Sequence, residues 1–259
     1  SDTWVATDFL GRSLPDYSEV GAPRTNRTVG IFYLEWLGAH STRLFDNARI
    51  LAANPTHPQF GPPGDFHFWS EPLFGYYLSD DDWVIRKHTQ MLTDAGVDVL
   101  IFDVTNGFLY DNVCNKVCIV WEEMRREGQR TPQFAFIAHS GESQVVQRLY
   151  DTYYSKGLYS NLWFRWQGKP LVLAAPTALT PALREFFTVR ESWAWTKGQP
   201  WFADGRDKWP WLDNYPQTFG WNVNSNVPEE ISVCVAQHPV SNIGRSFHDG
   251  KEPPPGQTD

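Results

Sequence analysis

The stretch SDDDWVIRKHTQMLTDAGVDVLIFDVTNG, from Ser79 to Gly107, decides the fold. Ser79 or Asp80 is the expected N-cap of a helix with an acidic first turn, and apolar or neutral residues then recur at helical spacing up to the expected stop at Gly96. A buried strand follows at once over residues 97–102. Nearly continuous apolar strands belong to parallel sheets that are covered on both faces. The stretch therefore predicts a helix-then-strand unit of an α/β fold.

The same alternation extends to both sides of this unit. Further strands are expected near residues 29–34, 134–138, 171–175, 192–195, 218–221 and 231–236. Helices are expected over residues 44–53, 110–126, 142–154 and 181–187, with an edge hairpin over 163–170. Seven strands separated mostly by helices predict a TIM-barrel-like (β/α)8 fold with its eighth strand missing. We expect one domain over residues 1–250 and a Pro-rich tail over 251–259.

Charge and composition exclude several classes of protein. The chain has 259 residues, and 22 Lys and Arg against 30 Asp and Glu give a formal net charge of −8. This excess of acidic residues provides no basic surface for nucleic-acid phosphates, and it disfavours binding to anionic membrane surfaces. No run approaches the roughly 20 apolar residues that span a bilayer. The sequence therefore predicts a protein without a nucleic-acid partner or a membrane span.

The three cysteines do not predict a disulfide framework. Cys114, Cys118 and Cys234 are few and odd in number, and the first two stand four apart on an expected helix. Two packed thiols explain that spacing better than a metal site does. No His/Asp spacing suggests a metal, and no phosphate loop or serine-hydrolase elbow is present, so we predict no metal and no cofactor.

Aromatic residues make up 15% of the chain, with 13 Trp. Many of them fill the core, but flat apolar faces flanked by polar groups also suit the stacking of sugar rings. The connection over residues 54–79 is rich in Pro, Gly and aromatics. So long a connection in a compact domain is usually functional or disordered, and its aromatic content argues against disorder.

In a barrel of this kind, reactive side chains come from the carboxyl ends of the strands and from the loops that follow. Two carboxylates among amide and aromatic groups fit glycosidic-bond chemistry, in which one carboxyl protonates the leaving oxygen and another acts as nucleophile or base. The expected catalytic residues are Asp103 and Glu35. The expected substrate-binding residues are Trp36, Trp69, Glu71, Asn106, His139, Trp195, Trp221, His238 and Arg245.

Each of these residues also has a structural explanation. Asp103 could cap the next helix, Glu35 could be a surface residue or a buried ion-pair partner, and His139 could bond a loop carbonyl. Glu71 could serve only to hold its loop in place, and Arg245 could lie in a solvated terminal segment. None of these residues alone decides between a structural and a functional role.

The motifs FHFWSEPLFGYY (66–77), WVIRKH (83–88) and DAGVDVLIFDVTNG (94–107) resemble a group of bacterial, often secreted, glycoside hydrolase-like proteins. That group is similar in fold to glycoside hydrolase families 71 and 99. Shorter matches at 162–164, 168–170, 209–211, 215–217, 235–237 and 244–246 extend the resemblance over roughly residues 4–250. The resemblance implies a barrel that acts on α-linked glycans. It favours a secreted or periplasmic location and leaves a cytoplasmic one open.

The sequence also departs from the group. There the segment after Gly244-Arg245-Ser246 continues into an eighth strand that ends in a Trp-Asn-Glu-Trp motif, whose Glu is the obvious acid. Here Trp221-Asn222 is followed by Val223 and not by Glu, so this segment does not supply the acid of the motif. We therefore expect a truncated hydrolase, or a barrel that another segment closes.

The leading hypothesis is a glycoside hydrolase-like protein that cleaves an oligo- or polysaccharide, and it leaves the oligomeric state open. The alternatives are a non-catalytic carbohydrate-binding barrel and an inactive fragment of the hydrolase.

Overall fold

The computed structural model describes residues 7, 11, 13–22, 24–38, 42–62, 65–213, 217–224 and 226–233. The chain divides into two compact units, one formed by residues 28–164 and the other by residues 1–27 together with 165–259. The single domain expected over residues 1–250 stays a prediction.

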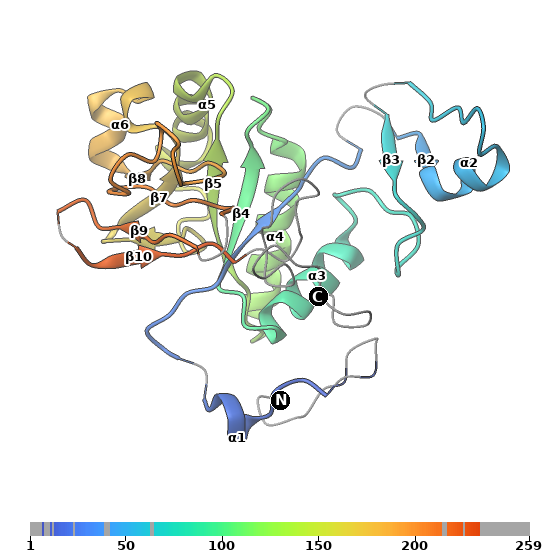
Figure 1. The fold of residues 1–259 in the computed structure, drawn as a ribbon, viewed down its shortest axis with the longest axis horizontal. Helices are drawn as coiled ribbons and strands as arrows, with labels where there is room; N and C mark the ends of the chain where they lie inside the picture. The colour runs from blue at the N-terminus through green and yellow to red at the C-terminus, as the bar shows by residue number, and fades with distance from the viewer. Residues whose placement is uncertain are drawn as a thin grey trace. The chain divides into compact units, whose positions relative to one another are not determined.

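The first unit, over residues 28–164, has a parallel sheet at its centre (Figure 1). Its strands are β1 (Gly30–Tyr33), β4 (Val99–Val104) and β5 (Gln133–Ala138), in the order β1-β4-β5. Both pairs are parallel, with Tyr33 opposite Phe102 and Val104 opposite Ala138. The Val29 N–H donates to the Asp98 carboxylate (2.9 Å), which fixes the start of β1 against β4.

Helices connect these strands as the alternation predicted. They are α3 (Asp82–Asp94), α4 (Asp111–Arg126) and α5 (Glu142–Leu149), and α5 continues into a π-helical turn, η1 (Tyr150–Tyr154). The expected helix over 142–154 is therefore α-helical only in its first part. The N-cap of α3 is Asp81, which accepts the Val84 N–H (2.9 Å), and not Ser79 or Asp80. Ser79 instead exchanges two hydrogen bonds with the Leu37 backbone.

The core of this unit lies between β4, β5 and the helices. The Phe102 and Phe134 rings stack 5.4 Å apart, and Phe102 also meets Trp121 of α4 at 6.0 Å. All three side chains are fully buried. The buried Trp121 N–H finds an acceptor in the Thr89 hydroxyl of α3 (2.7 Å), so the apolar packing of α3 on α4 leaves no indole donor unpaired.

The segment between β1 and α3 differs from the prediction. Leu44–Asp46 form a strand, β2, which pairs in parallel with β3 (Phe66–Phe68), and only α2 (Asn47–Ala53) is helical. The Asp46 carboxylate accepts the Arg49 N–H (3.0 Å) and starts the helix there. The long aromatic connection thus contains a short strand.

The second unit carries shorter elements. They are α1 (Tyr17–Val20), β6 (Arg165–Trp166), β7 (Lys169–Leu173), the 3₁₀ turn η2 (Pro176–Ala178), α6 (Pro181–Phe186), β8 (Thr188–Arg190), β9 (Gly220–Trp221) and β10 (Pro228–Glu230). The expected hairpin is confirmed: β6 and β7 pair antiparallel around Gln167 and Gly168, whose φ values of 53° and 84° suit a tight hairpin turn. Strand β8 pairs in parallel with β7, and β9 pairs antiparallel with β10.

Two expected strands of this unit are wrong in position. The strand expected over 192–195 lies earlier, at Thr188–Arg190, because Trp195 has a φ of 63°, in the left-handed region that a strand does not use. The strand expected over 231–236 is Pro228–Glu230, and residues 231–233 have no regular structure. Residues 234–236 lie outside the described residues.

The chain has an α/β fold with a parallel sheet and helices. The described strands of the first unit form an open sheet and no closed barrel. The described part of the chain therefore does not form the complete (β/α)8 barrel. The count of seven strands is not confirmed, because the described residues form ten, several of them only two or three residues long.

Candidate functional site

The candidate site lies at the carboxyl edge of β1, β4 and β5. Parallel strands bring their carboxyl ends to one edge, and the register puts Asp103 opposite Ile137. The loops that follow also meet there, since the Ser140 N–H donates to the Thr105 carbonyl (2.8 Å). The sequence-predicted residues Asn106 and His139, both exposed, therefore lie at the same edge as Asp103.

Asp103 belongs to β4 itself rather than to the loop after it. Side chains alternate along a strand, and Phe102 faces α4, so Asp103 faces the opposite side of the sheet. Its carboxylate accepts the Thr105 N–H (2.9 Å), and its side chain is only half-buried. One carboxylate oxygen thus shapes the turn after β4, and the residue at the N-cap of the next helix, α4, is Tyr110 and not Asp103.

Tyr110, which the sequence did not single out, is influenced electrostatically by both predicted carboxyls. It precedes α4 with a φ of 51° and gives the helix no side-chain cap. The Asn106 amide donates to its hydroxyl. Burial raises the pKa of Tyr110, the Asn106 donor opposes this, and the negative charges of Asp103 and Glu35 raise the pKa further. Tyr110 therefore lies within electrostatic reach of both carboxyls.

Glu35 is the most unusual group of the unit. Its side chain has no exposed surface, and neither carboxyl oxygen has a hydrogen-bond partner among the described residues. Burial raises the pKa of Glu35 well above its usual value, and Cys114 and Asp111 of α4 raise it further. Burying an unpaired charge is far more costly than burying a neutral carboxyl, so this environment favours the protonated form of Glu35.

A histidine that the sequence did not single out lies beside this region. His88 of α3 is within hydrogen-bond distance of the Tyr33 hydroxyl (3.1 Å from Nδ1), and its ring makes edge contact with Tyr77 (5.5 Å). Burial lowers the pKa of His88. Burial and then the charge of Glu35 raise the pKa of Tyr33. The helical spacing of the sequence predicted that His88 lies on the packed face of α3, but it did not indicate that Tyr33 is its partner.

The other predicted residues of this unit are exposed. Trp36 directly follows Glu35, and Trp69 follows β3 with 79% of its surface accessible. Glu71 pairs with Arg49 of α2, and Arg49 also lies over the Tyr76 ring, 5.7 Å from its centroid. The ion pair with Arg49 therefore supports the structural explanation, in which Glu71 holds its loop in place.

Trp195 and Trp221 belong to the other unit. The Trp195 carbonyl accepts the Trp201 indole N–H (2.8 Å), and its backbone N–H donates to Leu212 (2.7 Å). Trp221 pairs within the β9–β10 hairpin and meets Phe219 edge-on at 5.8 Å. His238 and Arg245 lie outside the described residues.

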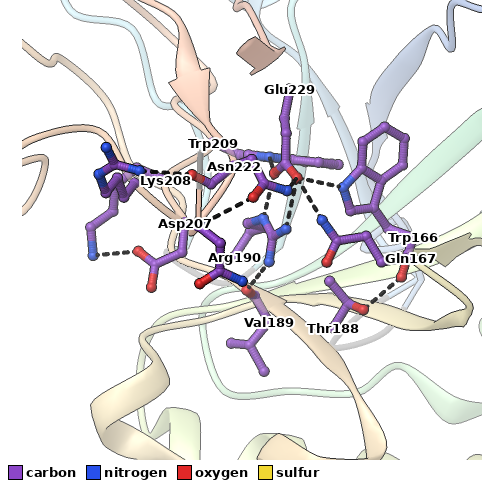
Figure 2. A network of polar contacts seen from close by, with 12 residues as sticks. Trp166, Gln167, Thr188, Val189, Arg190, Asp207, Lys208, Trp209, Asn222 and Glu229 are labelled. Carbon is purple, nitrogen blue, oxygen red and sulfur yellow. Dashed lines mark hydrogen bonds and ion pairs between the residues drawn. The ribbon is translucent and has the colours of Figure 1, made fainter. Parts of the chain in front are cut away.

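A second polar cluster surrounds Glu229 of β10 (Figure 2). Six N–H donors reach its two oxygens, and they come from Trp166, Gln167, Arg190, Trp209 and Asn222. Burial alone would raise the pKa of Glu229, but the Arg190 pair and the other donors outweigh it and lower the pKa. With its acceptors taken up by the protein, Glu229 suits a structural role better than catalysis.

The cysteines fit the packed-thiol explanation. Cys114 and Cys118 are free and fully buried in α4. Among the described residues, no group of three or more His, Cys, Asp or Glu side chains is placed to hold a metal ion. None of the helices in the described ranges is both long and apolar enough to cross a membrane.

Comparison with known proteins gives a distant likeness only. No family model and no curated protein matches the sequence. The structure is similar to that of the GH99 endo-alpha-mannosidase from Bacteroides thetaiotaomicron, with 24% identity and a TM-score of 0.37, over 60% of this chain and 47% of the enzyme. The same enzyme in complex with bis-tris-propane gives 22% identity and a TM-score of 0.35, over 60% of this chain and 44% of the enzyme.

This chain spans less than half the length of those structures. Likeness to family 71, a bacterial origin and a secreted or periplasmic location stay predictions.

Proposed function

We propose that the carboxyl edge of β1, β4 and β5 binds an oligosaccharide and hydrolyses a glycosidic bond, with Glu35 as the acid and Asp103 as the second carboxylate. Glycosidases need one carboxyl that holds a proton for the leaving oxygen and one that bears a charge opposite it. The two groups here have environments of those two kinds.

The protonation state of Glu35 supports the acid role. A carboxyl without partners in a sealed environment keeps its proton at neutral pH, which is the state in which a general acid starts. Since the side chain is sealed, transfer of its proton to a substrate requires the segment after β1 to move. Two hydrogen bonds between Leu37 and Ser79 tie down the far end of that segment.

The environment of Asp103 supports the role of the charged carboxylate. The side chain is half-buried and accepts a hydrogen bond from the Thr105 backbone N–H, which suits a charged carboxylate. Exposed Asn106 and His139 beside it are suited to order sugar hydroxyls, and half-exposed Trp36 to stack on a ring face. An α-linked oligosaccharide is the substrate class that we propose.

The observation that carries the proposal is the contrast between the environments of the two carboxyls. Glu35 is sealed and has no hydrogen-bond partner among the described residues, whereas Asp103 is half-buried and accepts a backbone N–H. Paired titratable groups with such different environments are the usual sign of an acid and its partner.

The test is product chromatography on a panel of α-linked manno- and gluco-oligosaccharides. We expect Glu35→Gln and Asp103→Asn each to lower kcat/KM by about 10²-fold or more, with unchanged far-UV spectra. Asp94→Asn, at an exposed carboxylate of α3 in the same unit, is the matched control and should keep wild-type turnover. Wild-type turnover in either active-site variant would remove that residue from the mechanism.

A second candidate is carbohydrate binding without catalysis. The sealing of Glu35 favours it, because an acid that no substrate reaches protonates nothing. Calorimetric binding of the same oligosaccharides that Trp36→Ala weakens, together with no product after long incubation, would select this function over hydrolysis.

A further inference from the structure

The segment over residues 34–38, the strap, carries Glu35 directly after β1. Glu35 has no exposed surface, whereas its two neighbours, Leu34 and Trp36, are 51% and 37% exposed. Residues 34–36 have no regular structure. The strap therefore lies at the surface, and Glu35 is the side chain that it buries, so displacement of the strap alone is enough to uncover this carboxyl.

The first end of the strap is fixed in the sheet. Tyr33, the last residue of β1, is paired with Phe102 of β4. Its hydroxyl also lies 3.1 Å from Nδ1 of His88 in α3, so the side chain as well as the backbone is held. A movement of the strap must therefore begin at its other end.

The second end of the strap is held by a pair of hydrogen bonds. The Leu37 N–H donates to the Ser79 hydroxyl (3.0 Å), and the Ser79 N–H donates to the Leu37 carbonyl (2.8 Å). Ser79 is buried and stands two positions before Asp81, the N-cap of α3. The strap is thus attached to the start of a packed helix, 42 positions away in the chain.

Gly38 follows this pair in a conformation that favours glycine. Its φ is 95°, and a Cβ added there would lie 3.3 Å from Cδ2 and 3.4 Å from Cβ of Leu78. A side chain at this position would therefore be strained by its own backbone and crowded by Leu78 as long as the strap is closed.

We propose that the strap is a gate over Glu35, with the Leu37–Ser79 pair as its latch and Gly38 as its hinge. Two hydrogen bonds between neutral groups contribute modestly to stability, so the latched form can open locally while the sheet and α3 stay folded. Opening frees the strap beyond Tyr33 and uncovers Glu35. The inference rests on the proposed function for its significance, because access to Glu35 matters when that carboxyl is the acid of the site.

The test is the rate at which a water-soluble carbodiimide couples glycine ethyl ester to the Glu35 carboxyl. Tryptic cleavage after Arg27 and Arg43 gives the peptide over residues 28–43, in which Glu35 is the one acidic side chain, so peptide mass spectrometry identifies the label. In the wild type, Glu35 should react far more slowly than exposed Asp94.

Two variants weaken the closed strap in different ways. Ser79→Ala removes the acceptor of the Leu37 N–H, and it should raise both the labelling rate of Glu35 and the hydrogen-exchange rate of the Leu37 amide about tenfold. Gly38→Ala strains the closed form, and it should raise the same two rates.

The matched controls lie in the same unit but away from the strap. Ser155→Ala removes an exposed hydroxyl that donates to the Asp151 carbonyl (3.3 Å). Gly96→Ala places a side chain at a φ of 82°, where its Cβ meets no atom within 4 Å. Neither variant should change the labelling of Glu35. The Phe102 amide of β4 should keep its protection in every variant, which distinguishes local opening from global unfolding.

An unchanged labelling rate of Glu35 in folded Ser79→Ala would overturn the proposal, and so would a wild-type Glu35 that reacts as fast as Asp94. If Ser79→Ala does not fold, the rate in Gly38→Ala decides in the same way. The labelling needs no sugar. Faster labelling without hydrolysis of any glycan would refute the proposed function and leave the gate standing, whereas hydrolysis with unchanged labelling would refute the gate alone.

Discussion

Arg190 and Glu229 form a doubly hydrogen-bonded ion pair in the second unit, with Nε 2.7 Å from Oε2 and Nη2 3.0 Å from Oε1. Each side chain is only 4% exposed. The pair links β8 to β10, and the indole and amide donors around it use the remaining acceptor capacity of the carboxylate (Figure 2). A buried pair of this kind is costly to break, because either partner alone leaves an uncompensated charge.

Glu229→Gln should lower the free energy of unfolding by about 3–5 kcal/mol, because it leaves the Arg190 guanidinium buried without its counter-charge. Urea denaturation followed by tryptophan fluorescence measures the change. Glu185→Gln is the control, since Glu185 pairs with Lys169 on the surface and such pairs contribute at most about 1 kcal/mol. Similar losses in the two variants would contradict the structural role of Glu229.

Glu230 makes the stability of its unit depend on pH. Burial, and then the charge of Asp213, raises the pKa of Glu230 to about 9 from an ordinary 4.5. Between these two values the unfolded chain releases the proton and the folded chain keeps it, so the stability that the neutral carboxyl contributes is lost as pH rises. The slope is at most about 1.4 kcal/mol per pH unit.

Glu230→Gln should therefore abolish this slope and be more stable than the wild type at pH 8, with little difference near pH 4. Urea midpoints at pH 4, 6 and 8 test this prediction. A wild-type chain with the same pH profile as the variant would show that Glu230 ionises normally. Glu185→Gln again serves as the exposed-carboxylate control.

Thr89→Val should lower the free energy of unfolding by about 1–3 kcal/mol. The Thr89 hydroxyl accepts the Trp121 indole N–H (2.7 Å) and donates to the Ile85 carbonyl (2.7 Å), and valine leaves the buried indole without an acceptor. Thr93→Val is the control on the same helix, because the Thr93 hydroxyl is buried without a partner among the described residues. That change should be neutral or stabilising, as chemical denaturation would show.

Gly220→Ala should destabilise the β9–β10 hairpin by at least about 1–3 kcal/mol. A Cβ at Gly220 would lie 2.0 Å from the Lys208 carbonyl oxygen, which belongs to the backbone and has little freedom to move. Gly30→Ala in β1 is the control, since its Cβ would meet only ordinary contacts at 3.6 Å or more. Equal thermal midpoints for the two variants would show that the backbone around Lys208 yields.

The α3–β4 unit could be predicted from the sequence because its signals are local. Acidic residues at a helix start, a glycine stop and an apolar strand act within a few positions of one another. The structure differs from the prediction at the N-cap and in the strand, which covers Val99–Val104 rather than residues 97–102. The predicted strand over 192–195 failed because the left-handed φ of Trp195 depends on Leu212 and Trp201, neither of which a local pattern contains.

The candidate site was predictable in part. The rule that parallel strands share a carboxyl edge was enough to select Asp103, Asn106 and His139. Tyr110 was missed although its hydrogen-bond partner, Asn106, is only four positions earlier in the chain. Glu229 was missed because its donors come from positions 166 to 222, which no local pattern brings together.

The sequence by itself determined that this chain alternates strands and helices and that polar residues follow its most apolar strands. Those properties depend on side-chain polarity and backbone preference, which act within one element. Only the tertiary structure decided that Glu35 is sealed, that Asp103 faces away from α4, and that the acceptors of Glu229 are occupied by donors of its own unit. Burial and pairing are set by the packing of separate elements, and they decide whether a carboxyl keeps its proton or its charge.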